Sequence, residues 1–194
     1  INEIQNILDQ IPGFNRYCSV DDLELLVKRI IDNDEFTVSL LGESDNGSPI
    51  HHVTFGEGSV KVLFLGFPHP DEPIGGMTVF SLLTLLINQC PDLVDLNVQW
   101  HIIPCIDPDG AKLNEGWTQK EFCLSNFMQN YHKQNLRDQV EVSFPIEYKD
   151  LFFNEPTTEC DILAKLIVDV KPDLLYSLHN ALAGGAYFYC NKEL

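Results

Sequence analysis

Two nearly continuous apolar runs constrain the fold of this chain most strongly. They occupy residues 59–67 (SVKVLFLGF) and 96–106 (LNVQWHIIPCI), and an apolar helical segment at 77–90 lies between them. Short runs of this kind are typical of strands that are covered on both faces of a sheet. Strands that alternate with helices predict an α/β fold built on a mostly parallel sheet.

The segment before these runs adds two helices and two further strands. Amphipathic helices are predicted at 2–15 and 19–35, and Ser19 is a suitable N-cap for the second. Residues 36–43 and 49–56 are short β-branched and apolar runs, which are typical of strands. The turn residues around them indicate that these strands and the next are linked by hairpins.

The second half predicts one more helix and one more strand. The sequence from Asp107 to Gly110 (DPDG) reads as a turn, and residues 111–153 read as irregular. A helix is expected over 154–170 and a strand over 173–180. We therefore expect one domain over residues 1–194, with a helical lead-in at 1–36 and a mixed, mostly parallel sheet flanked by helices.

Composition excludes several classes of partner. The net charge of −17 repels phosphate backbones and anionic lipid surfaces, so neither nucleic acid nor a membrane is expected as a partner. No apolar run approaches the ~20 residues of a membrane span, and no secretion signal is visible. The six cysteines form no CxxC pair, which fits a reduced cytoplasmic protein. They are Cys18, Cys90, Cys105, Cys123, Cys160 and Cys190.

Three metal-ligating side chains follow the carboxyl ends of two predicted buried strands. His69 and Glu72 come after the strand at 59–67, and His179 comes at the end of the strand at 173–180. If the two strands are parallel neighbours, these side chains converge at the edge of the sheet where open α/β folds bind ligands. Two imidazoles and a carboxylate leave a fourth position on zinc for water, as hydrolytic sites require.

Each of these residues also has an ordinary structural interpretation. A lone HxxE pattern arises often by chance, and a histidine at the end of a strand is more often hydrogen-bonded than metal-bound. The other four histidines are not expected to be ligands. They are His51, His52 and His101 inside predicted strands, and His132 in the irregular segment.

Five short motifs in order give the chain a resemblance to a known family. They are LGESDNGSPI (41–50), FPHPDE (67–72), IIPCIDPDG (102–110), NEPTTE (154–159) and YSLHN (176–180). The succession resembles the zinc carboxypeptidases of the metallocarboxypeptidase A type. That family has a G-x-S-x-x-G-R-P-I-like hairpin, HxxE, an N-P-D-G turn, an S-E-P-E helix start and S-L-H-S in the same order.

The resemblance implies a fold, a metal and a reaction. It implies a phosphorylase/hydrolase-like α/β fold, one zinc ion held by His69, Glu72 and His179, and hydrolysis of a peptide or amide bond by zinc-activated water. Carboxypeptidase A is a standard example of a site with two histidines and one glutamate, so this ligand set comes from the resemblance. The family has an aspartate that orients the first histidine, and Glu141 in QVEVSF is the candidate here.

The sequence departs from the family where substrate carboxylates are bound. Ser143 and Phe144 stand where the family has an Asn-Arg pair, and Asp71 stands where HxxE often carries a basic residue. An anion pocket without arginine loses geometric selectivity, so a substrate with an amide, acyl or cationic end is expected. The basic residues near enough in sequence to substitute are Lys120, Lys133 and Arg137.

The general base of the family is a glutamate well downstream of the third ligand. It is expected beyond Leu194, because Glu193 comes too early in the family's order, and the chain is then expected to cover about two thirds of such a domain. Two alternatives stay open. One is a deacylase of N-acyl amino acids of the aspartoacylase-like branch, and the other is an inactive metal-binding module on the same fold.

Overall fold

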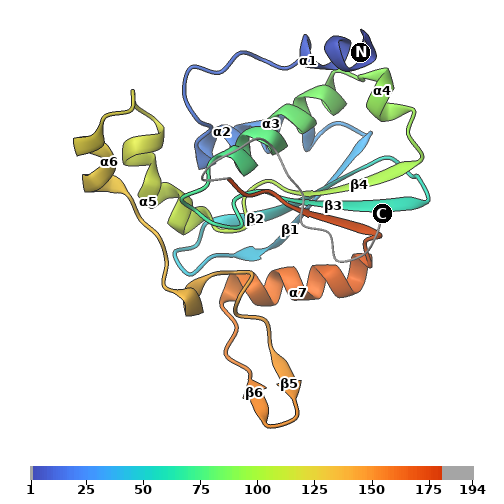
Figure 1. Ribbon diagram of the computed structural model, residues 1–194. Coiled ribbons are helices and arrows are strands. Elements are labelled where there is room, and N and C mark those ends of the chain that lie inside the picture. Colours follow the sequence, from blue (N-terminus) through green and yellow to red (C-terminus); the bar gives the residue numbers. More distant parts are fainter. Residues whose placement is uncertain (1, 181–194) are drawn as a thin grey trace.

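A mixed β-sheet forms the centre of the protein in a computed structural model that describes residues 2–180 (Figure 1). Within this range the order of its five strands is β1-β2-β4-β3-β7. Since β2 is antiparallel to both neighbours while β4, β3 and β7 are mutually parallel, every strand except β2 runs in one direction. The predicted α/β fold with a mostly parallel sheet is confirmed. The strands are β1 (Phe36–Glu43), β2 (Pro49–Phe55), β3 (Val60–Leu65), β4 (Val98–Ile103) and β7 (Leu174–Ser177).

Helices cover both faces of this sheet. Figure 1 shows α2 (Val20–Ile30) and α3 (Ile74–Ile87) on one face and α7 (Thr158–Val170) on the other. In the described part of the chain, no helix combines the length and the apolar character that crossing a membrane requires. The remaining elements are α1 (Asn2–Leu8), α4 (Pro91–Val94), α5 (Pro108–Thr118), α6 (Leu124–Asn130), η1 (Leu136–Asp138) and a hairpin of β5 (Ile146–Tyr148) with β6 (Leu151–Phe153).

The sheet separates two apolar clusters, one on each face. Leu23, Val27, Leu83 and Ile102 are among the buried side chains between the sheet and the α2–α3 layer. The cluster on the opposite face joins α7 to the sheet. It contains Ile50, Leu63, Leu65, Ile103, Ile106, Val140, Cys160, Leu163, Leu166 and Val170.

The cysteines largely follow the prediction. Cys90, Cys105 and Cys160 are buried small residues, as expected. Cys123 is exposed at the start of α6. Cys190 lies outside the described residues.

One predicted strand connection is wrong. The hairpin of β1 and β2 exists, but the next strand, β3, does not pair with β2. β4 lies between them and pairs with β2 on one side and β3 on the other. The reason is that β3, α3 and β4 form a parallel unit, which needs β3 and β4 side by side with the helix across one face.

Helix starts follow capping chemistry more closely than the predicted ranges. Ser19 caps α2 with a reciprocal hydrogen-bond pair to Asp22, as expected from the sequence. Thr157 caps α7, so the helix begins at Thr158 instead of residue 154, and Pro156 precedes it. α1 is shorter than predicted because the chain reaches Pro12 and Gly13, which disfavour a helix.

The prediction that residues 111–153 are irregular is wrong at both ends, because helices occupy the first part and the β5–β6 hairpin the last. α5 begins at Pro108, with the Asp107 side chain accepting a hydrogen bond from the Gly110 amide, and α6 follows at Leu124. Asp at the N-cap and Pro at the first helical position form a helix-start signal. The same DPDG residues that indicated a turn therefore begin a helix.

A pair of buried histidines lies on the α7 face of the sheet. His52 Nε2 is 2.9 Å from His101 Nδ1, and the two rings are stacked. His101 Nε2 is 3.1 Å from the Gln99 side-chain oxygen. Burial, with a smaller contribution from the neighbouring His101, lowers the pKa of His52 to about 4. Burial also lowers the pKa of His101, with a smaller contribution from the charge of Lys61.

This pair predicts a specific sensitivity of the fold to acid. The unfolded state takes up a proton near pH 6.5, whereas folded His52 resists it until about pH 4, so the free energy of unfolding falls as the pH drops through this window. The shift corresponds to about 3 kcal/mol. Urea unfolding at pH 7 and pH 4.5 should show a smaller loss in His52→Asn than in the wild type. The control His132→Gln should behave as the wild type, and equal losses in all three proteins would contradict the assignment.

Candidate metal centre

The pairing of β3 with β7 brings the three predicted ligands to one edge of the sheet. Leu65 is in register with Ser177, and the Leu178 amide donates to the Leu65 carbonyl oxygen beyond the last registered pair. The predicted parallel neighbours are thus observed. The chain leaves both strands at the same edge, and His69 and His179 follow within a few residues.

Glycine allows α3 to begin directly against this edge. A Cβ on Gly75 would lie 2.6 Å from the backbone oxygen of Leu178, and a Cβ on Gly76 would collide with the ring of Phe67. Phe67 itself has a φ of 52°, a left-handed conformation that is unusual for a bulky residue and turns the chain out of β3. These contacts fix the segment that carries His69 against the end of β7.

Glu72 connects the two histidines. Its Oε1 lies 3.1 Å from His69 Nδ1, and its Oε2 lies 2.7 Å from His179 Nδ1. The backbone amide of Asn180 also donates to Oε2. The two imidazole rings meet edge to face with their centroids 4.7 Å apart. Both Nδ1 atoms therefore point to the same carboxylate.

The electrostatics of Glu72 and His179 reflect this arrangement. Partial burial by itself would raise the pKa of Glu72, but the hydrogen bonds from His179, His69 and the Asn180 amide hold it well below its ordinary value. Hydrogen bonds to Glu141 and Glu72 raise the pKa of His179 to about 9, against the opposing effect of burial. The cluster thus strongly favours charged carboxylates beside a positively charged partner.

Glu141 contacts His179, whereas the sequence predicted His69 as its partner. Glu141 Oε2 lies 2.8 Å from His179 Nε2, and the Ser177 hydroxyl donates to Oε1 at 2.5 Å. Burial opposes ionisation of Glu141, yet the hydrogen bonds from His179 and Ser177 lower its pKa. The sequence motif suggested that Glu141 would bind His69. Instead, Glu141 binds Nε2 of His179, the ring nitrogen that does not contact Glu72.

The cluster offers a suitable donor set for a divalent cation. Single ligand atoms of His69, Glu141 and His179 lie within 4.8 Å of one another, as do those of His69, Asp71 and Glu72. Imidazole nitrogens with carboxylate oxygens suit zinc. The expected ligands His69, Glu72 and His179 all lie within this one cluster.

Asp71 does not present a free anion to a cationic substrate. Tyr131 donates its hydroxyl to Asp71 Oδ2 at 2.8 Å, and Lys133 Nζ lies 3.1 Å from both oxygens. Burial and the hydrogen bond to Asp71 raise the pKa of Tyr131 to about 12, which keeps the hydroxyl a donor. Both oxygens of Asp71 are thus engaged by groups of the protein itself.

The positions where the family binds carboxylates serve other roles here. Ser143 is 1% exposed, and its hydroxyl accepts a hydrogen bond from the Thr157 amide at the start of α7. Phe144 packs against the apolar cluster beneath α7. Of the basic residues considered as substitutes, Lys133 contacts the HxxE turn, whereas Lys120 and Arg137 are exposed elsewhere.

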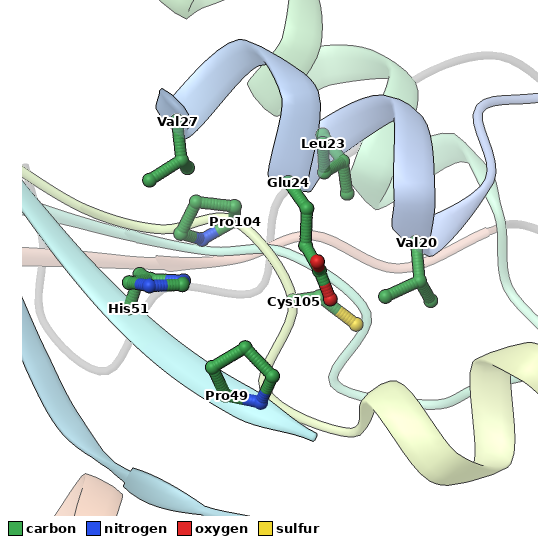
Figure 2. Close-up of a pocket in the computed structure, with 8 residues that line it drawn as sticks. All are labelled: Val20, Leu23, Glu24, Val27, Pro49, His51, Pro104 and Cys105. Carbon is green, nitrogen blue, oxygen red and sulfur yellow. The ribbon is translucent and has the colours of Figure 1, made fainter. Parts of the chain in front are cut away.

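The other histidines lie away from this cluster. His52 and His101 form the buried pair in the sheet, and the His132 backbone is bound by Asn114. His51 borders a small hollow under α2, where Figure 2 shows side chains of the helix facing Pro104 and Cys105. With a cavity of about 10 Å³, this hollow holds about one water molecule and no substrate.

Solved structures of carboxypeptidases match most of this chain. A metallo-carboxypeptidase from Burkholderia cenocepacia matches with a TM-score of 0.60 at 19% identity, over 85% of this chain and 41% of its own length. The chain has the carboxypeptidase fold. Carboxypeptidase A from Helicoverpa armigera matches with a TM-score of 0.61 at 16% identity, over 87% of this chain and 47% of its own.

A third match extends the range of proteins with this carboxypeptidase fold. Bovine thrombin-activatable fibrinolysis inhibitor, solved with a tick carboxypeptidase inhibitor, matches with a TM-score of 0.54 at 14% identity, over 86% of this chain and 61% of its own. The chain thus spans less than two thirds of the length of these structures. No protein-family model and no curated protein sequence matches it.

Substitution of Gly75 tests whether the close packing of α3 against the end of β7 shapes the candidate metal site. Alanine normally stabilises a helix by about 1 kcal/mol relative to glycine. At Gly75, however, the new Cβ meets the backbone of Leu178, and such overpacking costs about 1–3 kcal/mol. Gly75→Ala should therefore lower the free energy of unfolding measured in urea, and it should weaken metal binding. Gly13→Ala is the control, because nothing lies within 4 Å of its added Cβ; equal effects in both variants would contradict the steric argument.

Proposed function

We propose that the protein is a zinc-dependent hydrolase of peptide or amide bonds, in which His69, Glu72 and His179 hold one zinc ion. The observation that carries the proposal is the convergence of two imidazole Nδ1 atoms on the two oxygens of Glu72. The carboxypeptidase fold supports it, because the cluster lies at the sheet edge where such folds bind ligands. Zinc bound by three protein ligands polarises a carbonyl group and lowers the pKa of its bound water to about 7.

The residues around the ligands have defined tasks in this proposal. Glu141 and Ser177 hold the His179 ring through Nε2, so Nδ1 is the nitrogen that would bind the metal once its proton is released. Glu141 thus acts as the orienting carboxylate, for His179. The proton acceptor of the reaction is not assigned to any of these residues; the family resemblance implies a glutamate in that role.

The proposed substrate is a small peptide or an N-acyl or amide compound. Ser143 and Phe144 are occupied by packing and capping contacts, so they supply no cation for a terminal carboxylate. The net charge of −17 further disfavours highly anionic substrates. A substrate whose terminal group is blocked or neutral fits these features better than an ordinary peptide with a free carboxylate.

Metal analysis tests the ligand assignment directly. The dialysed wild-type protein should contain about one zinc ion per chain, as a site with three protein ligands predicts. His69→Ala and His179→Ala should each lose it, because two remaining ligands bind zinc weakly. His51→Ala is the matched control and should keep the metal. Unchanged zinc in both ligand variants would refute the assignment.

A substrate panel then separates the alternatives. The zinc-loaded protein would be incubated with free peptides, blocked peptides and N-acyl amino acids, and product formation measured by chromatography. Hydrolysis of blocked peptides would support the peptidase, and hydrolysis of N-acyl amino acids the deacylase. Stoichiometric zinc without turnover of any compound, in a chain that includes the expected general base, would contradict a hydrolase and favour a metal-binding module.

A further inference from the structure

Asp71 carries a carboxylate that would compete for the metal. It lies between His69 and Glu72 in the sequence, and one of its carboxylate oxygens lies within 4.8 Å of ligand atoms of both. A carboxylate at such a distance can coordinate zinc after a small movement. If Asp71 bound the ion, it would fill the position that a hydrolytic zinc site keeps for water.

Two side chains from a different part of the chain bind Asp71 instead. Lys133 Nζ lies 3.1 Å from each carboxylate oxygen, and the Tyr131 hydroxyl donates to Oδ2 at 2.8 Å. The Asp71 side chain is only 9% exposed in this contact. Both carboxylate oxygens of Asp71 therefore contact the positively charged Lys133, and Oδ2 also accepts a hydrogen bond from Tyr131.

The backbone around Tyr131 and Lys133 is itself held in place. Asn114 on α5 is 1% exposed, and its side-chain amide donates to the His132 carbonyl oxygen while its oxygen accepts from the His132 amide. Tyr131, at the end of α6, has an extended backbone. In extended chain, residues two apart point to the same side. Fixing His132 thus directs Tyr131 and Lys133 together toward Asp71.

We propose that Tyr131 and Lys133 keep Asp71 out of the metal coordination shell, so that His69, Glu72 and His179 are the protein ligands and one position stays open. This inference rests on the proposed function. Its basis is the juxtaposition of a competing carboxylate with two donors that a buried asparagine holds in place. Tyr131 and Lys133 are positioning residues in this scheme, because they act on the site through Asp71.

The test uses Co²⁺ as a spectroscopic probe in place of zinc. The double variant Tyr131→Phe/Lys133→Met removes both donors while keeping the size of the side chains. Asp71 should then join the ion, and the visible absorption bands of Co²⁺ should weaken, because a higher coordination number lowers their intensity. Adding Asp71→Asn to the double variant should restore the wild-type spectrum, because the competing ligand is gone.

A matched control and the contrary outcomes make the test decisive. Lys165→Met removes another Lys–Asp pair, the exposed one with Asp161 on α7, and should leave the Co²⁺ spectrum unchanged. An unchanged spectrum in the double variant would overturn the inference, and so would loss of metal from it, since Tyr131 and Lys133 would then build the site. If the wild type bound neither Co²⁺ nor Zn²⁺, the proposed function itself would fail.

Discussion

The parallel pairing of β3 with β7 is the constraint on which the candidate metal centre depends. These strands are more than a hundred residues apart in the sequence, yet Leu65 and Ser177 are in register and Leu178 extends the pairing. Because both strands end at the same edge, the residues after them share one small volume. A shift of register would alter the alignment of His179 with Glu72, and it would also move Leu175, which pairs with Leu63 beside the α7 cluster.

Much of the fold follows from local patterns, because apolar periodicity and caps are properties of neighbouring residues. The strands at β1, β2, β3, β4 and β7 and the Ser19 cap of α2 were predictable in this way. The position of β4 between β2 and β3 was not, since pairing of distant strands depends on tertiary packing. The helix α5 carried a usable signal, with Asp107 before Pro108, but the same residues are equally good turn formers.

The candidate site was predictable in its components but not in its contacts. HxxE and the later histidine, together with the expectation of neighbouring strands, suffice to bring His69, Glu72 and His179 together. Which ring nitrogen meets Glu141 depends on the path of residues 139–144, and that path follows the burial of Val140 and Ser143 under α7. Likewise, the partners of Asp71 come from a segment whose position is set by Asn114, so no local pattern around HxxE reveals them.

The contacts of Asp71 have a consequence for the charge balance of the centre. Asp71 and Lys133 cancel as a pair, so Glu72 and Glu141 are the uncompensated carboxylates beside the two imidazoles. With neutral imidazoles, which metal binding requires, the cluster carries two formal negative charges. A divalent ion makes it neutral, whereas a monovalent ion leaves one negative charge in a partly buried place where uncompensated charge is costly. In the proposed centre, the pairing of Lys133 with Asp71 would thus favour a divalent over a monovalent cation.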